Sequence, residues 1–514
     1  MMNFFKWTKS KSKDESGLIG GAILIGLSTA SFLVAATTWS AFAIWAVAAV
    51  VAAAAYAYSD SMMPSMASSP TYASDSIQNT VSEGVYVARC YGRCRIGGNK
   101  LRYGPKNGGD KRIIVGHCVG PVSGVQTYYV NDIPWAELTG GSSKTEYTGT
   151  RTQSPDARFT AYDRPASYRG IAYTAFTFGL QDQQIGYDPN VTVIMDGLLC
   201  TPLAGGADAF TRNPAVILYD WYLNVEGYAA GDLDLNAFKS LEAFCDAVPV
   251  DGTIARYRFD FNFDTNMAIN DAKKIIWASF NGFAVKSQGK IKPIWDSAQM
   301  ADGSGGLTAK TVSHAFDLDN IVKDSFTWNE IEKPNLVRIH YKDPDNKYAS
   351  ASVEEKDEID IDLNGEILYE ETAWFITDAE IARRRAKFKF GKKRYPDYQA
   401  EFTALSGASD LEVLDLVTIT HSLPGWTTKQ FLVLSRAEDE LGRMKFMCEA
   451  YYPGIYDDKQ TGTQAGYPSE LPNPYQTPPA STAISSSMVA LGNPYDFDSV
   501  RVSFTPPATD PFYS

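Results

Sequence analysis

Residue types that commonly carry catalysis or bind metals are few in this chain and lie far apart. The histidines are His117, His314, His340 and His421. The sequence contains no His-Glu-X-X-His motif, no Gly-X-Ser-X-Gly motif and no phosphate-binding loop. The only close pairing of a histidine with a cysteine is His117 and Cys118, and neighbouring residues on a strand point to opposite faces. We therefore expect no enzymatic activity. One alternative stays open, because the paired carboxylates of a glycosidase form no sequence motif.

The six cysteines leave two interpretations open. Cys90 and Cys94 are separated by three residues and Cys118 lies downstream, so these side chains are either metal or iron–sulfur ligands or buried thiols. Their spacing matches no common zinc pattern, which favours buried thiols. Cysteines scattered along a long chain also argue against a small disulfide-stapled secreted domain. We expect reduced thiols and no cofactor.

Composition and charge restrict the classes of function. The chain has 514 residues, which is enough for about three or four domains. Apolar residues make up 44% and aromatic residues 13%, and the 29 tyrosines favour sheets and interfaces. The net charge is −13, so the field of the whole chain repels nucleic acid. We expect a β-rich multidomain protein without sequence-specific binding to nucleic acid, and an acidic lumen would let DNA pass without sticking.

The beginning of the chain is the strongest anomaly of composition. Residues 1–16 form a basic leader that carries Lys6, Lys9, Lys11 and Lys13 among Phe4, Phe5 and Trp7. From Ser16 to Ser59 there is no charged residue, and this run is roughly twice the ~20 apolar residues that cross a bilayer. It predicts one long helix or a helical hairpin bent near Thr37. Small residues favour close helix packing and tryptophans favour interfaces. The residues assigned to helix packing or membrane contact are Gly17, Gly21, Gly26, Trp39 and Trp45.

The middle of the chain combines helix and strand signals. Asn213 precedes a proline and an apolar pattern at helical spacing. A second helical pattern opens at Asp234, with an Asp or an Asn placed to cap its start. Aromatic and polar residues alternate from Tyr257 to Phe263, which predicts a strand. A third helix is predicted from Asn266 to Phe280. It ends at Asn281, and two strands follow it. This stretch therefore predicts a small α/β module.

Two charged segments follow farther on. Glu354 to Asp362 is strongly acidic and is interpreted as a solvated rim, with a cation site as the alternative. The acidic segment lacks the full pattern of a calcium loop. Asp378 to Phe388 predicts a basic helix with Arg383, Arg384 and Arg385 in a row. We interpret it as a surface helix paired with acidic neighbours, and a phosphate-contacting helix is the alternative.

Several segments, in this order, resemble the hub domain of long-tailed bacteriophages, the family that includes the lambda-type central tail-tip (host-specificity) protein. The resemblance covers roughly residues 86–456. It is carried by RNPAVILYDWYLN, TNMAINDAKKIIWASFNGFAV and GKIKPIWD in the middle of the chain, and by IEKPNLVRIHYKDPDNKYASASV and EIARRRAKFKFGKKRYPDYQAEFTA farther on. No single short motif is diagnostic, and the order of the segments carries the assignment.

The resemblance implies an α+β, β-rich multidomain fold. It has two tube-like β-barrels plus a small α/β module, preceded by a long apolar helical segment. Together with the shifts in composition, this predicts the following domains. They are a basic leader and apolar segment at 1–59, a linker at 60–78, a first barrel at 79–211 with an insertion at 140–166, the α/β module at 212–296, a second barrel at 297–456, a Pro/Ser-rich linker at 457–487, and the start of a fibronectin-III-like module at 488–514.

The resemblance also implies a function. It predicts a structural hub protein at the distal end of a phage tail, made in the host cytoplasm and placed at the tail tip of the virion. Three copies would form a ring that continues the tail tube, closes it before infection and opens to release the tape-measure protein and DNA. Expected partners are the other copies of the homotrimer, distal tail and tail-tip proteins, the tape-measure protein and a central fibre. The chain lacks most C-terminal fibre modules of the lambda-type proteins, which argues against direct receptor binding by this chain.

The apolar run and the function each keep alternatives. The run is a secretory signal, a membrane anchor or, as the resemblance implies, a set of helices packed together inside an oligomer. In the third case residues 17–58 act as a plug or contact the host membrane at ejection. A secretory signal would need a shorter apolar core of about 7–15 residues. The alternative function is a membrane-anchored surface adhesin or a component of a secretion apparatus. A cell-wall-degrading enzyme has no supporting motif.

Overall fold

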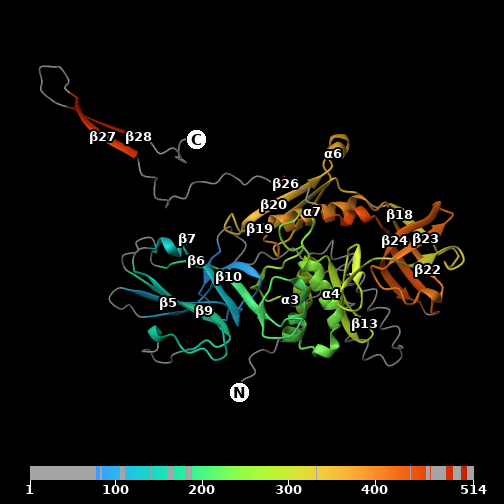
Figure 1. The fold of residues 1–514 in the computed structure, drawn as a ribbon, viewed down its shortest axis with the longest axis horizontal. Coiled ribbons are helices and arrows are strands. Elements are labelled where there is room, and N and C mark those ends of the chain that lie inside the picture. The colour runs from blue at the N-terminus through green and yellow to red at the C-terminus, as the bar shows by residue number, and fades with distance from the viewer. Residues whose placement is uncertain are drawn as a thin grey trace, which may run out of the picture. The chain divides into compact units, whose positions relative to one another are not determined.

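The fold is taken from a computed structural model that describes most of the chain between residues 77 and 464 and one later hairpin (Figure 1). The described residues are 77–81, 84–104, 110–138, 141–159, 166–179, 185, 188–323, 325–330, 333–439, 442–458 and 463–464, with the strands at 482–489 and 499–505. They fall into two compact units, one that ends at Gln464 and one that begins at Ala465. Each unit is described by itself.

Two sheets that share one core open the first unit. Val115 and Phe176 of the first sheet and Val130 and Val193 of the second belong to the same buried cluster. In order across the first sheet, the strands are β1 (Asn79–Thr80), β4 (Gly98–Tyr103), β5 (Lys111–Val119), β9 (Ile171–Phe178) and β8 (Ser143–Thr148). The second sheet has β11 (Ala209–Phe210), β10 (Val191–Cys200), β6 (Val122–Val130) and β7 (Ile133–Pro134), and β3 (Arg93–Ile96) also pairs with β10.

Part of the expected insertion at 140–166 belongs to this first sheet. Strand β8 pairs antiparallel with β9, from Ser143 opposite Thr177 to Thr148 opposite Ala172. The Gly/Ser/Thr-rich composition of the stretch therefore did not indicate the edge strand that it contains. An edge strand is paired on one side only and tolerates polar residues. Two short 3₁₀ turns, Trp135–Glu137 and Ala157–Phe159, connect the strands of this region.

The helices of the middle of the chain lie where their caps and spacing predict them. The Asn213 side chain accepts a hydrogen bond of 2.8 Å from the amide of Ala215, and the Asp234 side chain accepts one of 3.2 Å from the amide of Ala237. These caps begin α3 (Pro214–Trp221) and α4 (Leu235–Asp246). The remaining elements are a π-helical turn (Tyr222–Glu226), a 3₁₀ turn (Ala230–Asp232), α5 (Ile269–Ser279), β13 (Gly282–Ser287) and β14 (Lys290–Trp295).

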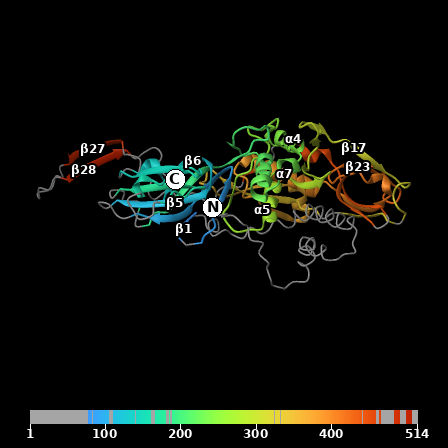
Figure 2. The ribbon, with the colours of Figure 1, turned by 90° about the horizontal axis from the view of Figure 1, so that it is seen from below.

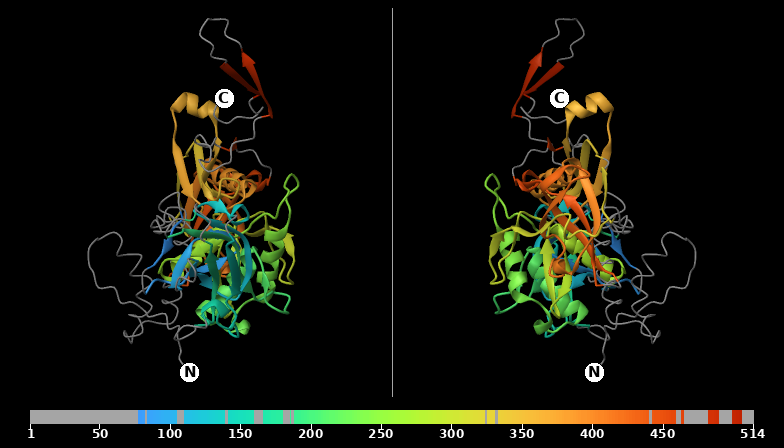
Figure 3. Two further views of the ribbon diagram at one scale, coloured as in Figure 1. Left: turned by 90° about the vertical axis from the view of Figure 1, so that its left-hand side faces the viewer. Right: turned by 90° about the vertical axis from the view of Figure 1, so that its right-hand side faces the viewer.

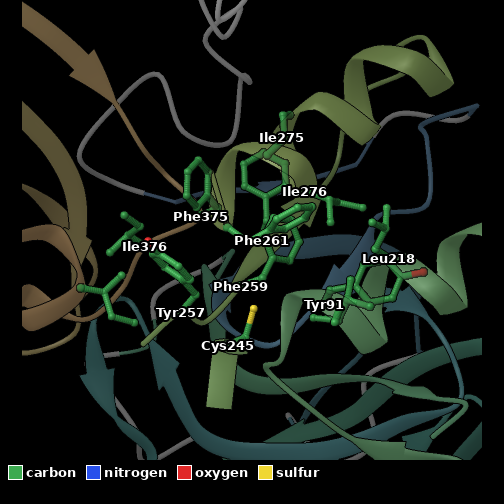
Figure 4. Close-up of a cluster of buried hydrophobic side chains, with 14 of the residues drawn as sticks. Tyr91, Leu218, Cys245, Tyr257, Phe259, Phe261, Ile275, Ile276, Phe375 and Ile376 are labelled. Carbon is green, nitrogen blue, oxygen red and sulfur yellow. The ribbon is translucent and has the colours of Figure 1, made fainter. Parts of the chain in front are cut away.

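A strand pair connects this middle part to the beginning of the described chain. Strand β12 (Phe261–Phe263) pairs antiparallel with β2 (Arg89–Tyr91). Their aromatic side chains enter the largest buried cluster, in which Tyr91, Phe259 and Phe375 come from three distant segments (Figure 4). The strand predicted from Tyr257 to Phe263 begins only at Phe261 in the structure. The cluster contains residues from the second sheet, the helices and the later chain, so one core connects these parts.

A four-stranded sheet with one long helix follows. Its order is β21 (Leu368–Thr372), β19 (Leu336–Asp343), β20 (Ala349–Lys356) and β26 (Thr463–Gln464), and β21 runs parallel to β19. Between β20 and β21 the chain forms the short helix α6 (Glu358–Asn364). Helix α7 (Ala379–Arg394) packs against β19 and β20. Val337, Tyr341 and Val353 of the sheet and Ile381 and Ala386 of α7 extend the largest cluster.

A six-stranded sheet completes the first unit. Its order is β17 (Val312–Phe316), β23 (Leu416–His421), β24 (Trp426–Glu438), β25 (Met444–Ala450), β22 (Tyr398–Ala404) and β18 (Thr327–Glu330). Phe316, Phe402 and Phe446 pack at the centre of its own buried cluster. The hairpin β15 (Gln299–Ala301) and β16 (Leu307–Ala309) precedes it, and 3₁₀ turns lie at Ser406–Ala408 and Pro453–Tyr456.

The expected fold class is wrong. In the described part of the chain the sheets are open and none closes into a tube-like barrel, since the end strands β1 and β8, and likewise β17 and β18, do not pair with each other. No helix among the described residues is long and apolar enough to cross a membrane. The longest, α7, is basic. The expected apolar segment at 1–59 lies outside the described residues. Short strands with turn signals are shared by barrels and open sheets, and only the pairing of the end strands separates the two.

The second unit is described only by one hairpin. Strands β27 (Thr482–Val489) and β28 (Ser499–Thr505) pair antiparallel. The expected start of a fibronectin-III-like module, like the other domain boundaries, stays a prediction.

Candidate functional site

The residues assigned to helix packing or membrane contact are not placed by the structure. They lie in residues 1–76, outside the described part of the chain, and they are Gly17, Gly21, Gly26, Trp39 and Trp45.

The histidines lie in separate environments. His117 is buried between the carbonyl of Gly97, 3.2 Å from Nδ1, and the hydroxyl of Thr174, 3.0 Å from Nε2. Burial lowers the pKa of His117 to about 4. His340 contacts Glu370, with Nε2 2.6 Å from a carboxylate oxygen. Of the other two, His314 packs against Phe316 with the rings tilted, and His421 stacks on Phe326. The structure therefore brings no two of these histidines into one site.

The cysteines at the beginning of the described chain gather in one buried place. The Cys118 Sγ atom lies 3.4 Å from the Sδ atom of Met195, and the Cys94 thiol donates to the carbonyl of Tyr91 at 3.6 Å. Cys90 interacts with Cys94, and this contact and burial raise the pKa of the Cys90 thiol. Among the described residues no group of three or more His, Cys, Asp or Glu side chains is arranged to hold a metal ion. The geometry favours free, buried thiols.

Charged side chains instead converge around helix α7. Arg384 is 5% exposed, and it donates to Glu380 at 2.6 Å and to the carbonyl of Ala255 at 3.0 Å. At the other end of the helix, Arg394 pairs with Asp357 at 2.9 Å. The contacts with Ala255 and Asp357 join α7 to segments far away in the sequence. We call the three buried groups of charges around α7 the first, second and third joints, and they are described in turn.

The first joint lies between α7, the end of α5 and strand β21, and Figure 2 shows α5 beside α7. Arg385 and Glu371 are each 3% exposed at the side chain. The Arg385 guanidinium donates to Glu371 at 2.8 Å, to the carbonyl of Ala278 at 2.6 Å and to the side chain of Asn281 at 3.1 Å. The Phe375 ring lies 5.1 Å from the guanidinium carbon. A cation inside the core is thus surrounded by three acceptor residues, one on β21 and two at the end of α5.

The second joint lies where the chain enters α3 and α7. Arg212 donates to Asp260 at 2.8 and 2.5 Å and to Asp378 at 2.8 Å. The Asp260 side chain is fully buried, and it also accepts from the Thr377 hydroxyl at 2.5 Å and from the amide of Arg93 at 2.7 Å. Burial by itself would lower the pKa of Arg212, but the two aspartates raise it above its ordinary value. One carboxylate therefore ties β3, the start of α3 and the start of α7 together.

A glycine makes room for this second joint. Gly92 has φ +66°, and a Cβ atom added to it would lie 2.1 Å from the carbonyl oxygen of Phe259. The left-handed conformation and the close approach of a backbone both require glycine. The turn between β2 and β3 thereby brings the amide of Arg93 onto Asp260.

The third joint connects the C-terminal turn of α7 to the six-stranded sheet. Lys392 pairs with Glu449 of β25 at 2.7 Å and with Asp296 at 3.0 Å. The hydroxyl of Tyr456 donates to Asp296 at 2.6 Å. Lys310 also lies in this joint, and its buried ammonium has no hydrogen-bond partner among the described residues. Burial lowers the pKa of Lys310 to about 8, although Asp296 opposes the shift.

The interpretation of the basic helix is correct about its acidic neighbours and wrong about its exposure. Arg384 and Arg385 are buried, so α7 is a core helix. One local signal points to this, because Arg385 lies four residues after the buried Ile381 and therefore on the same helical face. Asp260 and Glu371 carry no such signal, since their partners are more than ten residues away.

The three joints make the packing of α7 against its neighbours rigid. Removing one partner of a buried ion pair costs about 3–5 kcal/mol, compared with about 0–1 kcal/mol for an exposed pair. Three such joints hold α7 against the first pair of sheets, the middle helices and the six-stranded sheet. The described residues can therefore resist or transmit displacement between these elements.

One protein-family model matches part of the chain. A family model described as "Putative phage tail protein" matches residues 323–433, from just before β18 into β24. This segment supplies Glu371, Asp378 and Arg385 of the joints. No match was found among curated protein sequences.

One of the solved structures that align with this chain shares its fold. A chain from the virion of a native gene transfer agent particle aligns with a TM-score of 0.54 and 15% identity, over 86% of this chain and 98% of that chain. A 43 kDa tail protein of prophage MuSo2 from Shewanella oneidensis aligns at 13% identity over 67% of this chain and 99% of its own, with a TM-score of 0.28. A tail protein from Neisseria meningitidis aligns at 10% identity over 73% of this chain and 99% of its own, with a TM-score of 0.31. Residues 323–433 are therefore similar to a phage tail protein family, and the chain shares its fold with a chain of a virion.

Proposed function

We propose that the chain is a structural hub at the distal end of a tail. Three copies form a ring that closes the tail tube before infection and opens to release the tape-measure protein and DNA. The neighbours of this ring in the virion are distal tail and tail-tip proteins, the tape-measure protein and a central fibre. The role is mechanical and uses no catalytic group.

One observation carries the proposal. The segment that matches the phage tail family contains α7 and three strands of the four-stranded sheet, and ion pairs around α7 connect the sheets of the first unit. A protein that must keep its shape while a tube is closed and then opened needs elements that move as rigid bodies, and buried ion pairs with several acceptors provide that rigidity.

Two further features support a ring. Edge strand β18 is exposed at all four of its residues, and a sheet edge left open in one copy is a natural place for contact with another. The net charge of −13 favours the passage of DNA over its capture. Contact of residues 17–58 with a host membrane stays a prediction, because these residues lie outside the described part of the chain.

The mass of the particle that the purified full chain forms in solution tests the proposed trimer. Sedimentation velocity should give a particle of about three times the 56.4 kDa chain mass, and a variant without residues 1–60 should give trimers as well. A strictly monomeric result for both proteins would contradict the trimer. Electron microscopy of particles that carry a tag on this chain tests the position, and a tag found along the tube or at the head would contradict a distal hub.

A further inference from the structure

An acidic corner at the end of the four-stranded sheet exposes aliphatic side chains. It consists of residues 358–368, namely α6 and the turn into edge strand β21, and we call it the α6 corner (Figure 3). Ile359 and Leu363 lie one helical turn apart and are 75% and 77% exposed. Ile367 and Leu368 are 41% and 45% exposed. Single exposed aliphatic residues are common on soluble proteins, but a group of them marks an interaction site.

The α6 corner is held firmly at its base. Asn335 is fully buried, and its side chain donates to the carbonyl of Gly365 and accepts from the amide of Ile367, both at 2.7 Å. The backbone carbonyl of Asn335 accepts from the amide of Asp357 at 2.9 Å. Arg394 of α7 clamps the Asp357 side chain at 2.9 Å. Both ends of α6 are therefore tied to the sheet and to α7, so the exposed aliphatic side chains belong to a preformed surface.

The charges around these side chains restrict the partner. Glu358 is 76% exposed and pairs with Lys356 at 3.1 Å. Asp362 and Glu366 are exposed, and they form no ion pair with any described residue. A symmetric contact between two α6 corners would place carboxylates against carboxylates, which is unfavourable. The surface instead fits a partner that is cationic and apolar at the same time.

One segment of this chain has that chemistry. Within residues 1–13, lysines recur among aromatic residues, and no acidic residue interrupts them. These residues are Phe4, Phe5, Lys6, Trp7, Lys9, Lys11 and Lys13. We propose that the leader, residues 1–13, binds the α6 corner of its own chain or of a second copy. Its aromatic side chains cover Ile359 and Leu363, and its lysines pair with the carboxylates of the corner. The inference does not depend on the proposed function.

The covalent connection favours this occupant over a free partner. Residues 14–78 separate the leader from β1, and an extended chain spans at most about 3.5 Å per residue, so the length permits the contact. A tethered segment also acts at a high effective concentration, up to the millimolar range for short linkers, so a weak contact is enough to keep it bound.

Zero-length cross-linking of the full chain tests the contact. A water-soluble carbodiimide joins a lysine amine to a neighbouring carboxylate, and mass spectrometry then identifies the joined peptides. Lys333 and Asp397, 2.6 Å apart and 33% and 40% exposed, provide an internal reference for the yield. We expect leader lysines joined to Asp362 or Glu366 at a yield comparable to the reference. Cross-links from these carboxylates to other lysines only, or none from the leader, would overturn the proposal.

Substitution of the aliphatic side chains tests which contacts matter. Ile359→Ser combined with Leu363→Ser should lower the leader cross-links at least about tenfold, as expected when two apolar side chains lose their cover. Leu423→Ser, at a residue 70% exposed in the turn between β23 and β24, is the matched control and should leave them unchanged. All three side chains are exposed, so unchanged melting and an unchanged reference yield should show that the variants fold. An undiminished yield in the double variant would refute the docking.

Discussion

Glu371→Gln should loosen α7 from strand β21 by about 3–5 kcal/mol, because it leaves the buried guanidinium of Arg385 without its counter-ion. Each of the two side chains is 3% exposed, so water cannot replace the lost carboxylate. Lys389, whose Nζ atom lies 3.7 Å from Glu371, loses one ionic partner as well. Glutamine keeps the size of the side chain and one acceptor oxygen, so the change isolates the charge.

Hydrogen exchange of the α7 amides is the suitable assay. A unit with several sheets does not have to unfold in one step, and exchange reads the local free energy of opening. The matched control is Glu358→Gln, which removes a carboxylate that is 76% exposed and should leave exchange in α7 unchanged. Glu371→Leu combined with Arg385→Met should recover most of the loss, since apolar side chains of similar volume often replace a buried pair at no cost. Equal exchange in Glu371→Gln and Glu358→Gln would refute the reasoning.

Three further predictions follow from the other joints. Asp260→Asn should destabilise the first unit by about 3–5 kcal/mol, because Arg212 keeps its buried charge, and an unchanged melting temperature would contradict this. Gly92→Ala should lower the free energy of unfolding by at least about 1–3 kcal/mol, because alanine is strained in the left-handed conformation and its Cβ atom would lie 2.1 Å from the Phe259 carbonyl oxygen. Unfolding in urea measures this loss. Burial lowers the pKa of Lys310 from 10.5 to about 8, so between these values the unfolded chain binds more protons and the free energy of unfolding rises with pH. Lys310→Met should remove this rise relative to the unsubstituted chain, and an identical pH profile in both proteins would contradict it.

Local structure in the middle of the chain was predictable from the residues. Asn213 and Asp234 each cap a helix, and α5 ends at Ser279, one residue before the predicted end at Phe280. These signals are local, because a cap acts within three residues and a helical face repeats every three or four. The acidic segment is only partly the predicted solvated rim, because Glu358 and Asp362 of α6 are exposed whereas Glu354 and Glu355 belong to β20 and are half-buried.

The ion pairs of the three joints could not be predicted from such local signals. Arg385 and Glu371 are 14 residues apart, and Arg212 and Asp378 are 166 apart. Nothing near Asp260 in the sequence indicates a buried carboxylate with four donors. The same limit applies to the thiols, because the position of Cys118 next to Met195 depends on how β5 and β10 face each other.

By itself, the sequence determined the positions of the central helices, the acidic character of the chain and its likeness to phage tail proteins. Only the tertiary structure decided that the sheets stay open and that the arginines of α7 are buried. The physical reason is the distance along the sequence over which each interaction acts. Caps and periodic patterns depend on neighbours within one or two turns, whereas the closure of a sheet and the burial of a charge depend on strands and carboxylates that the chain brings together from afar.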